Sequence, residues 1–274
     1  MFNNPLYIIF SDLDGTLLDH DTYEYTDAAE ALEYIKREKI PLVLCSRKTR
    51  PEIEYYRTRL GLEDPFISEN RADIFISKGT QDIDDVPFVE YEGYKVIELG
   101  VPYNRIKSCF AEIKAETGLK ILGFSEMSVA QVVEFTGLSH DAAKLAHMRD
   151  YSEPFLFMEE ESRLEVLERA VHKKGLKITK GGRFYHLIGD NDKGKALRIV
   201  RKLYEQEGRS LISIGLGDSL NDLPMLENVD IPVLVQKKTG EYEPWTGNKK
   251  IVFAPGVGPK GWNRAVLEIF RIEE

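Results

Sequence analysis

Residues 7–16, YIIFSDLDGT, run from an apolar segment into two aspartates and a glycine. A short apolar run bounded by polar and turn-forming residues is typical of a buried β-strand. Alternate residues of an extended segment point to the same side, so we expect Asp12 and Asp14 to face one cleft while Leu13 faces the core. Gly15 permits a sharp turn after them. Ligands of open parallel sheets bind beyond the carboxyl ends of the strands, and this stretch therefore predicts a site there.

A calcium-binding EF-hand loop is the obvious competitor for two aspartates at this spacing. That loop requires an acidic ligand at the position of Thr16 and a glycine at the position of Leu17. Neither requirement is met, so the EF-hand interpretation is excluded.

Strand-like runs alternate with helical patterns at both ends of the chain, at residues 6–11, 26–39 and 40–46 and again at 196–208, 210–217 and 230–236. Asp27 followed by Glu30 resembles a helix capping box. Alternation of this kind indicates right-handed crossovers and a mostly parallel sheet. The sequence therefore predicts an α/β fold with a Rossmann-like core.

The middle of the chain has a different pattern. Serine-initiated helices and short strands follow one another, with prolines near the start of the region and the Gly181–Gly182 pair near its end, where turns form readily. We interpret residues 84–186 as an α+β cap inserted into a catalytic core made of residues 1–83 and 187–274.

The composition limits the classes of function. Among 274 residues the formal net charge is −9, and the isoelectric point is near 5.3, which argues against non-specific binding to nucleic acid or to an anionic membrane. No apolar run approaches the roughly 20 residues that span a bilayer, and the N-terminus lacks the pattern of a secretory signal. We therefore expect a cytoplasmic protein, with Cys45 and Cys109 as reduced, buried thiols.

A second group of acids follows another strand-like run in residues 211–226, LISIGLGDSLNDLPML. Asp218 and Asp222 would be neighbours if this segment turns helical, and Asn221 adds a neutral polar group. The alternative is an ordinary helix N-terminus, whose dipole favours acids. The segment alone leaves both interpretations open.

Two further segments could bind phosphate. Residues 42–50, LVLCSRKTR, place the Ser46 hydroxyl at a strand end, followed by Arg47, Lys48 and Arg50; hydroxyls, backbone amides and cations hold phosphate oxygens. Taken individually, Arg47 and Arg50 are interpreted as solvated surface charges. Lys193 opens a predicted helix, where a cation is unfavourable unless an anion lies nearby. Because clustered acids would repel a phosphate, the combination calls for a divalent cation, for which Mg²⁺ is the best candidate.

The motifs DLDGT, Ser46, Lys193 and GDSLND, in this order, resemble those of the haloacid dehalogenase superfamily of phosphohydrolases. The resemblance implies that Asp12 is a nucleophile forming an aspartyl-phosphate and that Asp14 is the general acid and base. It also implies that Ser46 and Lys193 hold the transferring phosphoryl group. The implied Mg²⁺ ligands are Asp12, the Asp14 backbone carbonyl, Asp218 and Asp222.

A closer resemblance, carried by segments such as CSRKT, MSVAQVVEFTGLSHDAAKLA, RDYSEPFLF, GGRFYHLIG and PGVGPKGW, is to the mannosyl-3-phosphoglycerate phosphatase family. It implies hydrolysis of mannosyl-3-phosphoglycerate to phosphate and mannosylglycerate, a compatible solute. The carboxylate of that substrate requires a cation in the cap. The candidate substrate-binding residues are Lys48, Arg149, Glu153, Arg183, His186 and Asn221. In the segment SENRAD, Arg71 stands where this family usually has glycine, which bears on sugar specificity.

Three other interpretations remain in view. The same chemistry would serve another sugar phosphate, such as glucosyl-3-phosphoglycerate, or a phosphomannomutase. A phospho-accepting or Mg²⁺-dependent binding protein without turnover would need no long central insertion. A nicotinamide-binding domain is disfavoured because Leu220 stands where the G-x-G-x-x-G pattern that would begin at Gly215 requires its third glycine.

Overall fold

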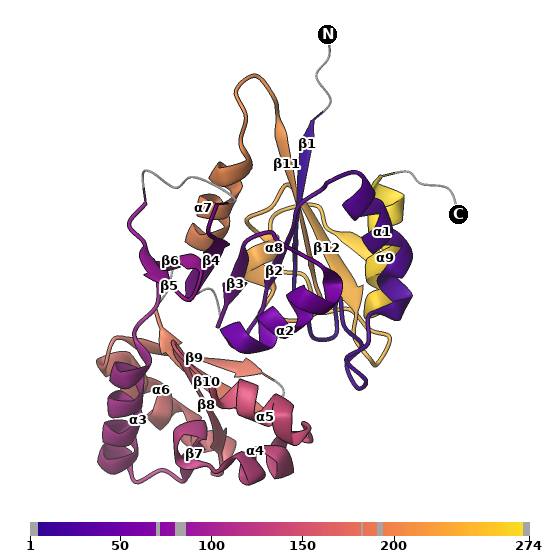
Figure 1. Ribbon diagram of the computed structural model, residues 1–274. Coiled ribbons are helices and arrows are strands. Elements are labelled where there is room, and N and C mark those ends of the chain that lie inside the picture. Colours follow the sequence, from indigo (N-terminus) through magenta and orange to yellow (C-terminus); the bar gives the residue numbers. More distant parts are fainter. Residues whose placement is uncertain (1–4, 70–71, 80–85, 182, 191–193, 271–274) are drawn as a thin grey trace.

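The computed structural model describes residues 5–69, 72–79, 86–181, 183–190 and 194–270. The chain forms a larger body from the first and last parts of the described sequence and a smaller body from its middle (Figure 1). The predicted combination of an α/β core and an inserted α+β module is confirmed.

A nine-stranded sheet organises the larger body, in the order β13-β12-β11-β1-β2-β3-β4-β6-β5. Pairing is parallel from β13 to β3 and antiparallel from β3 onward. The strands are β1 (Leu6–Ser11), β2 (Leu42–Cys45), β3 (Phe66–Ser68), β4 (Asp73–Ser77), β5 (Val89–Tyr91), β6 (Tyr94–Glu98), β11 (Leu211–Gly217), β12 (Ile231–Gln236) and β13 (Val252–Val257). β1 lies between β11 and β2, so the ends of these three strands are neighbours.

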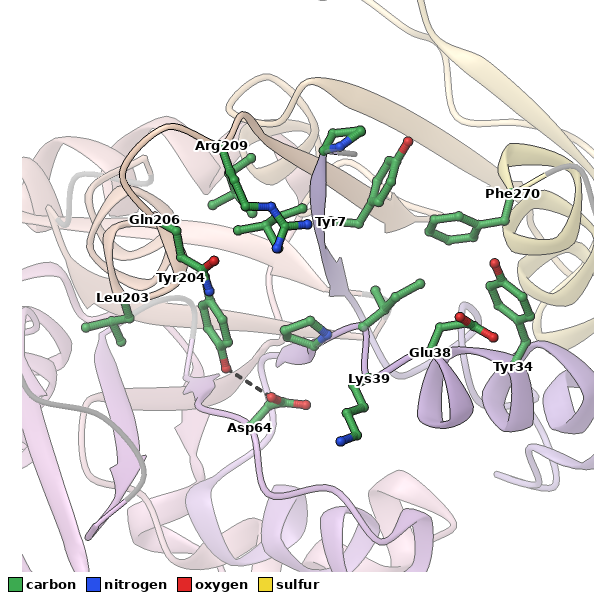
Figure 2. Close-up of a pocket in the computed structure, with 15 residues that line it drawn as sticks. Tyr7, Tyr34, Glu38, Lys39, Asp64, Leu203, Tyr204, Gln206, Arg209 and Phe270 are labelled. Atoms are coloured by element: carbon green, nitrogen blue, oxygen red, sulfur yellow. Dashed lines mark hydrogen bonds between the residues drawn. The ribbon is translucent and has the colours of Figure 1, made fainter. Parts of the chain in front are cut away.

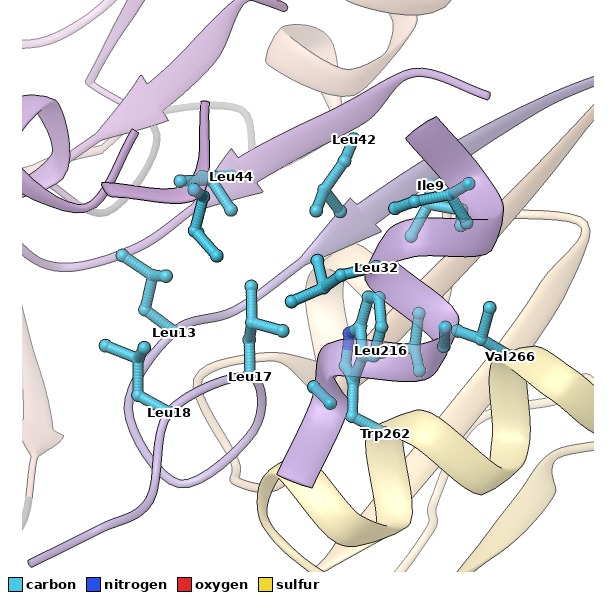
Figure 3. Packing of buried hydrophobic residues seen from close by; sticks show 14 of the residues in the cluster. Ile9, Leu13, Leu17, Leu18, Leu32, Leu42, Leu44, Leu216, Trp262 and Val266 are labelled. Carbon is cyan, nitrogen blue, oxygen red and sulfur yellow. The ribbon is translucent and has the colours of Figure 1, made fainter. Parts of the chain in front are cut away.

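Helices cover both faces of this sheet, and the alternation of side chains along β1 shows why. Ile9 packs with residues of α1 (Ala29–Arg37), α2 (Arg50–Leu60) and α9 (Pro259–Ile269), whereas Ile8 and Phe10 pack with residues of α7 (Lys195–Tyr204) and α8 (Leu223–Leu226). Figure 3 shows Leu32 of α1 and Trp262 of α9 packed together over the first of these faces. The short helix η1 (Thr26–Ala28) precedes α1.

The predicted capping box at Asp27 and Glu30 is wrong. Asp27 lies inside η1, α1 begins two residues later at Ala29, and neither helix has a side-chain hydrogen bond at its N-cap. Among the described helices, capping boxes with a side-chain N-cap bond occur instead at Thr49–Glu52 and Ser128–Gln131.

The smaller body is a four-stranded antiparallel sheet in the order β7-β8-β10-β9 with helices packed on it. Its elements are α3 (Tyr103–Thr117), β7 (Ile121–Gly123), η2 (Phe124–Glu126), α4 (Val129–Thr136), α5 (His140–His147), β8 (Ser152–Phe157), η3 (Glu161–Arg163), α6 (Leu164–Lys173), β9 (Leu176–Gly181) and β10 (Phe184–Gly189). Two hydrophobic clusters of its own fill this body. We call it the cap.

Strand pairing divides the chain slightly differently from the predicted bounds of 84 and 186. β5 and β6 extend the large sheet, whereas β10 pairs within the cap sheet up to Gly189. By this criterion the cap runs from about residue 99 to residue 189, and the division into functional domains stays a prediction. Cys45 and Cys109 form no disulfide among the described residues and are buried, as expected. In the described ranges, no helix combines the length and apolar character that crossing a membrane requires.

Candidate active site

Three carboxylates meet at the carboxyl end of the parallel sheet. β1 and β11 pair in parallel, and the Asp12 amide continues this ladder by donating to the Leu216 carbonyl at 3.0 Å. Asp12 therefore emerges beside Asp218, which follows β11. Asp12, Asp218 and Asp222 each place an oxygen within 4.8 Å of the other two. The sequence prediction that these acids gather is confirmed.

The segment after β11 is folded around the Asp222 side chain. Asp222 Oδ2 accepts hydrogen bonds from the amides of Asp218 and Ser219 and from the Ser219 hydroxyl at 2.9 to 3.2 Å. Asp222 is 3% exposed, and one of its oxygens is thus committed to holding the turn. Asp218 lies against Gly15, where φ is +75° and a Cβ atom would be 2.8 Å from Asp218 Oδ2. Only glycine fits this contact without a shift.

The three carboxylates are electrostatically unfavourable without a cation. Burial and the charges of Asp222, Asp14 and Asp218 raise the pKa of Asp12 well above its usual range. Burial and Asp222 likewise raise the pKa of Asp218 to about 7. Oxygen ligands gathered at this distance fit a hard divalent cation, whose charge would remove the repulsion. The residues present therefore suit Mg²⁺.

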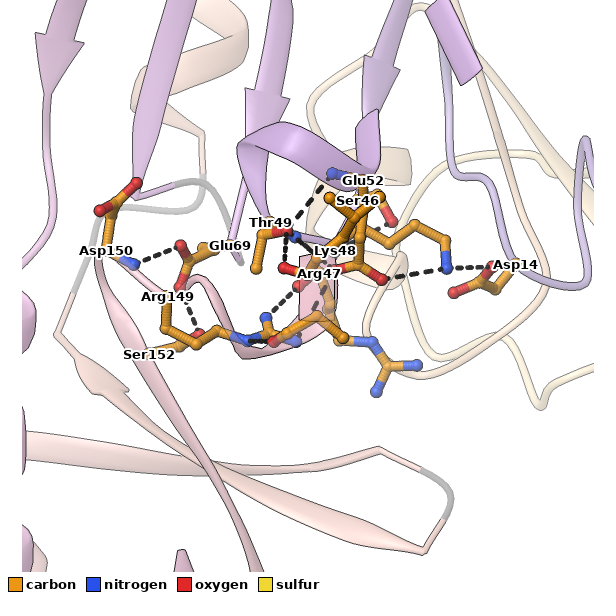
Figure 4. Close-up of polar contacts among 12 residues, drawn as sticks. Asp14, Ser46, Arg47, Lys48, Thr49, Glu52, Glu69, Arg149, Asp150 and Ser152 are labelled. Carbon is orange, nitrogen blue, oxygen red and sulfur yellow. Dashed lines mark hydrogen bonds and ion pairs between the residues drawn. The ribbon is translucent and has the colours of Figure 1, made fainter. Parts of the chain in front are cut away.

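Asp14 is held on the other side by Lys48. Lys48 Nζ lies 3.0 Å from Asp14 Oδ1 and 3.6 Å from Glu52 Oε1 (Figure 4). Burial opposes the charge of Lys48, but Asp14 and Glu52 outweigh it and raise the pKa of the amine overall. The rings of Tyr23 and Tyr56 also contact the ammonium group. Lys48 stays charged at neutral pH and fixes the direction of the Asp14 carboxylate.

The remaining core residues predicted for the site are placed unequally. Ser46 follows β2 and is 6% exposed; its hydroxyl accepts from the Lys48 amide at 3.3 Å. Asn221 lies in the turn between Asp218 and Asp222. Lys193 and Arg71 lie outside the described residues, so their predicted positions stay predictions.

Trp262 supports the site, although no pattern in the sequence indicates this role. Its indole Nε1 donates to the Ser11 hydroxyl at 3.0 Å, and that hydroxyl donates to the Asp12 carbonyl at 2.7 Å. Trp262 is fully buried and fixes the backbone that carries Asp12. The segment PGVGPKGW contributed to the resemblance, but an apolar tryptophan 250 positions from Asp12 gave no chemical signal.

A cleft of about 390 Å³ lies between the core and the cap. The core contributes Asp14, Tyr23, Arg47 and Lys48 to its wall. The cap contributes Phe124, Phe135, Thr136, Leu138, Arg149, Arg183, Phe184 and His186. The cap therefore completes a chamber in front of Asp14.

Two of the predicted substrate-binding residues are occupied by structural contacts. Arg149 donates to the Ala146 carbonyl and to the Arg47 carbonyl, both at 2.8 Å, and its side chain is 6% exposed. Glu153 is fully buried inside the cap, where its carboxylate accepts from Tyr103 and Ser125. Arg149 thus joins the cap to the core, and Glu153 joins elements of the cap.

His186 and Arg183 do line the cleft. His186 is 8% exposed, and its Nδ1 is buried without a hydrogen-bond partner among the described residues. Burial, Arg47 and Arg149 hold the pKa of His186 well below its usual value, so the ring is neutral. Arg183 is exposed, and its guanidinium donates to the Phe135 carbonyl.

A larger cavity of about 840 Å³ lies at the opposite end of the sheet, where β1 and β11 begin (Figure 2). Tyr7, Tyr34, Asp64, Tyr204 and Arg209 line it. Its lining residues, all from the described ranges, include none of the predicted site residues. Asp14, Lys48, Arg149, Arg183 and His186 line the smaller cleft instead, which makes that cleft the candidate site.

The fold and this carboxylate site define a hydrolase of the phosphoryl-transfer type. Residues 9–242 match the haloacid dehalogenase-like hydrolase family, and the chain belongs to this family. Two solved structures support the fold alone. A Thermoplasma acidophilum protein has a TM-score of 0.69 and 16% identity over 98% of this chain and all of that one. A phosphatase of the same superfamily from Bacteroides thetaiotaomicron has a TM-score of 0.68 and 16% identity over 99% of this chain and 97% of that one.

Curated relatives are similar over nearly the whole chain. The glucosyl-3-phosphoglycerate/mannosyl-3-phosphoglycerate phosphatase of Methanococcoides burtonii is 47% identical over 96% of this chain and 97% of its own. The protein of the same name from Persephonella marina is 44% identical over 96% of each chain. The mannosyl-3-phosphoglycerate phosphatase of Pyrococcus furiosus is 37% identical over 83% of this chain and 90% of its own. The resemblance found in the sequence and the expected enzyme class, a phosphatase, are confirmed.

Proposed function

We propose that this protein is a Mg²⁺-dependent phosphatase that releases phosphate from mannosyl-3-phosphoglycerate or glucosyl-3-phosphoglycerate and leaves the glycosylglycerate. The observation that carries the proposal is the group of Asp12, Asp218 and Asp222 within 4.8 Å of one another, beside a cleft that the cap completes. The names of the relatives support the choice of substrate.

In this proposal Asp12 attacks phosphorus and forms an aspartyl-phosphate while the bond between phosphorus and the glycerate oxygen breaks. Asp14 gives a proton to the departing alkoxide and later takes one from the water that hydrolyses the intermediate. The ion pair with Lys48 at 3.0 Å supports this role for Asp14, because it holds the carboxyl group in one direction. Ser46 and Lys193 would hold the transferring phosphoryl oxygens.

Mg²⁺ would be held by Asp12, Asp218, the Asp14 carbonyl and, directly or through water, Asp222. When bound it supplies positive charge that offsets the charge of the phosphoryl group and keeps the Asp12 carboxylate ionised. The raised pKa values of Asp12 and Asp218 support the need for such a charge.

A phosphate-release assay over a substrate panel tests the proposal. The panel contains mannosyl- and glucosyl-3-phosphoglycerate, 3-phosphoglycerate and hexose phosphates, each with Mg²⁺ and with EDTA. We expect the two glycosyl-phosphoglycerates to have the highest kcat/KM and EDTA to abolish release. A flat profile would contradict the substrate assignment, and undiminished release in EDTA would contradict the metal. A phosphomannomutase would instead convert hexose phosphates with little free phosphate.

A further inference from the structure

Four arginine or lysine side chains line the cleft among the described residues: Arg47, Lys48, Arg149 and Arg183. A phosphoglycerate ester carries two anionic groups, the phosphate and the carboxylate, so two sets of cationic contacts are needed. The partners that each cation already has decide which of them can meet the carboxylate.

Three of the four cations are engaged. Lys48 is bound by Asp14 and Glu52 at 3.0 and 3.6 Å. Arg149 donates hydrogen bonds to the carbonyls of Ala146 and Arg47. Arg183 is exposed and donates to the Phe135 carbonyl on the cap side of the cleft.

Arg47 differs from these three. Its Nη1 is buried and has no hydrogen-bond partner in the part of the chain that the structure describes. In Figure 4 no dashed line ends on the Arg47 guanidinium, whereas its carbonyl accepts from Arg149. A buried guanidinium nitrogen without a partner is destabilising, and an anionic ligand would satisfy it.

The surroundings of Arg47 place this group between the two halves of the site. Arg47 lines the cleft together with Asp14 of the core and His186 of the cap. The guanidinium therefore lies in the same cleft as the cap residue His186 and the core carboxylate that follows Asp12 by two positions. His186, whose Nδ1 has no hydrogen-bond partner among the described residues, adds a neutral polar group to the same cleft.

We propose that Arg47 binds the carboxylate of the glycerate unit in the substrate; this inference rests on the proposed function. In a 3-phosphoglycerate ester the phosphate is on C3 and the carboxylate is C1 of the same three-carbon unit. A substrate whose phosphorus lies at Asp12 therefore carries its carboxylate only a few bonds away, within reach of the cleft that Arg47 and His186 line. The planar guanidinium fork suits a carboxylate.

The test compares two ligands that differ only in this group. Binding of 3-phosphoglycerate and of glycerol 3-phosphate, in which a hydroxymethyl group replaces the carboxylate, is measured by calorimetry on the full chain with Mg²⁺. We expect R47Q to weaken 3-phosphoglycerate by roughly 10- to 100-fold, the range of a charge-assisted hydrogen bond. The affinity for glycerol 3-phosphate should change by less than about 3-fold in the same variant, since this ligand has no carboxylate for Arg47 to bind. R47K should recover part of the loss.

Arg183→Gln is the matched control, because it removes an arginine from the same cleft. A loss of 3-phosphoglycerate binding that follows Arg183→Gln instead of Arg47→Gln would overturn the inference. Equal weakening of both ligands by R47Q would also overturn it, since Arg47 would then act on the phosphate. The binding test requires no turnover. If the wild-type protein binds 3-phosphoglycerate through Arg47 but releases no phosphate from any compound of the substrate panel, the result supports this inference and contradicts the proposed function.

Discussion

Burial and three neighbouring carboxylates make the ionised form of Asp12 unfavourable, and the nucleophile of the proposed reaction is therefore least stable in the metal-free protein. Removing the charge of Asp12 should therefore raise the stability of the metal-free protein and lower its activity. The same carboxylate that disturbs the fold without a cation is the one that the reaction needs.

We expect Asp12→Asn to lower kcat by at least about 1,000-fold. In EDTA at pH 7.5 the neutral amide should also raise the melting temperature, by roughly 2–4 °C for each kcal/mol of relieved repulsion in a chain of this size. Phosphate release and thermal unfolding measure the two effects. Asp19→Asn is the control: Asp19 is in the same loop, its carboxylate accepts from the Asp21 and Thr22 amides, and turnover should persist. Substantial activity in the Asp12 variant would contradict the nucleophile assignment.

The pKa of Asp218, about 7 in the metal-free protein, predicts a pH dependence. Between its ordinary value of 3.8 and about 7, the folded state holds a proton that the unfolded state has lost. Metal-free stability should therefore fall as pH rises through this window. Protons compete with Mg²⁺ for the same oxygens, so the rise in melting temperature on adding Mg²⁺ should be larger at pH 8 than at pH 6. An equal rise at both pH values would contradict the prediction.

Gly15 can be tested separately from ordinary glycine strain. Gly15→Ala places a Cβ 2.8 Å from Asp218 Oδ2 at φ +75°, whereas Gly208→Ala meets nothing within 4 Å at φ +76°. Both variants should lose about 1 kcal/mol of stability from the backbone alone. Only Gly15→Ala should also lower Mg²⁺-dependent activity. We expect a loss of roughly 10-fold or more, as is usual when a group that positions a metal ligand is displaced. Equal activity of the two variants would contradict a role for the close contact.

At the scale of secondary structure, α9 supports β1 through the hydrogen bond from Trp262 to Ser11. Trp262→Phe keeps most of the buried ring but leaves the Ser11 hydroxyl without its donor. We expect the free energy of unfolding, measured with denaturant, to fall by about 1–3 kcal/mol, the usual cost of an unsatisfied buried group or a small cavity. We also expect a lower kcat. Trp245→Phe is the control, because that indole donates to the Lys249 carbonyl on the surface. Equal loss of kcat in both variants would contradict the link.

The sequence predicted elements well where the signal was local. Apolar runs and their spacing predicted β1, β2, β11 and β12, and the acids at two of their ends predicted the Asp12–Asp218–Asp222 cluster. The pairing of β5 and β6 with the large sheet could not be predicted. The residues of β5 are all exposed and carry no burial pattern. β6 has only two buried residues, Val96 and Ile97, and its pairing with β4 is set by tertiary folding. The role of Arg149 as a substrate ligand stays a prediction. The sequence could not show its present partners, because these are carbonyls that only tertiary folding places.

At the scale of the whole molecule, the cap is attached to the core through a buried acid. Glu69, which is fully buried, accepts hydrogen bonds from the amides of Asp150 and Tyr151 and from the Ser152 hydroxyl at 2.6 to 3.1 Å. These residues connect α5 to β8. Desolvation raises the pKa of Glu69. The charge of Arg149 and these hydrogen bonds lower the pKa, but desolvation outweighs them.

Glu69→Gln should loosen this attachment, because an amide nitrogen would face donors in place of a carboxylate oxygen. We expect faster hydrogen exchange at residues 150 and 151 and a higher KM. Glu159→Gln is the control, since its carboxylate accepts only from the Lys120 amide within the cap among the described backbone groups; exchange there should change at residue 120 alone. Unchanged exchange at 150 and 151 in the Glu69 variant would contradict the prediction.

The loop of residues 46–49 belongs to both bodies at once. It carries Ser46, Arg47 and Lys48, and its Arg47 carbonyl and Thr49 hydroxyl bond to Arg149 and to the Leu145 carbonyl of the cap. Because the two sets of contacts share one short backbone, we expect ligand binding and the attachment of the cap to be thermodynamically linked. Such linkage is reciprocal. If a closed cap raises the affinity for a ligand by some factor, the ligand raises the equilibrium constant for closure by the same factor.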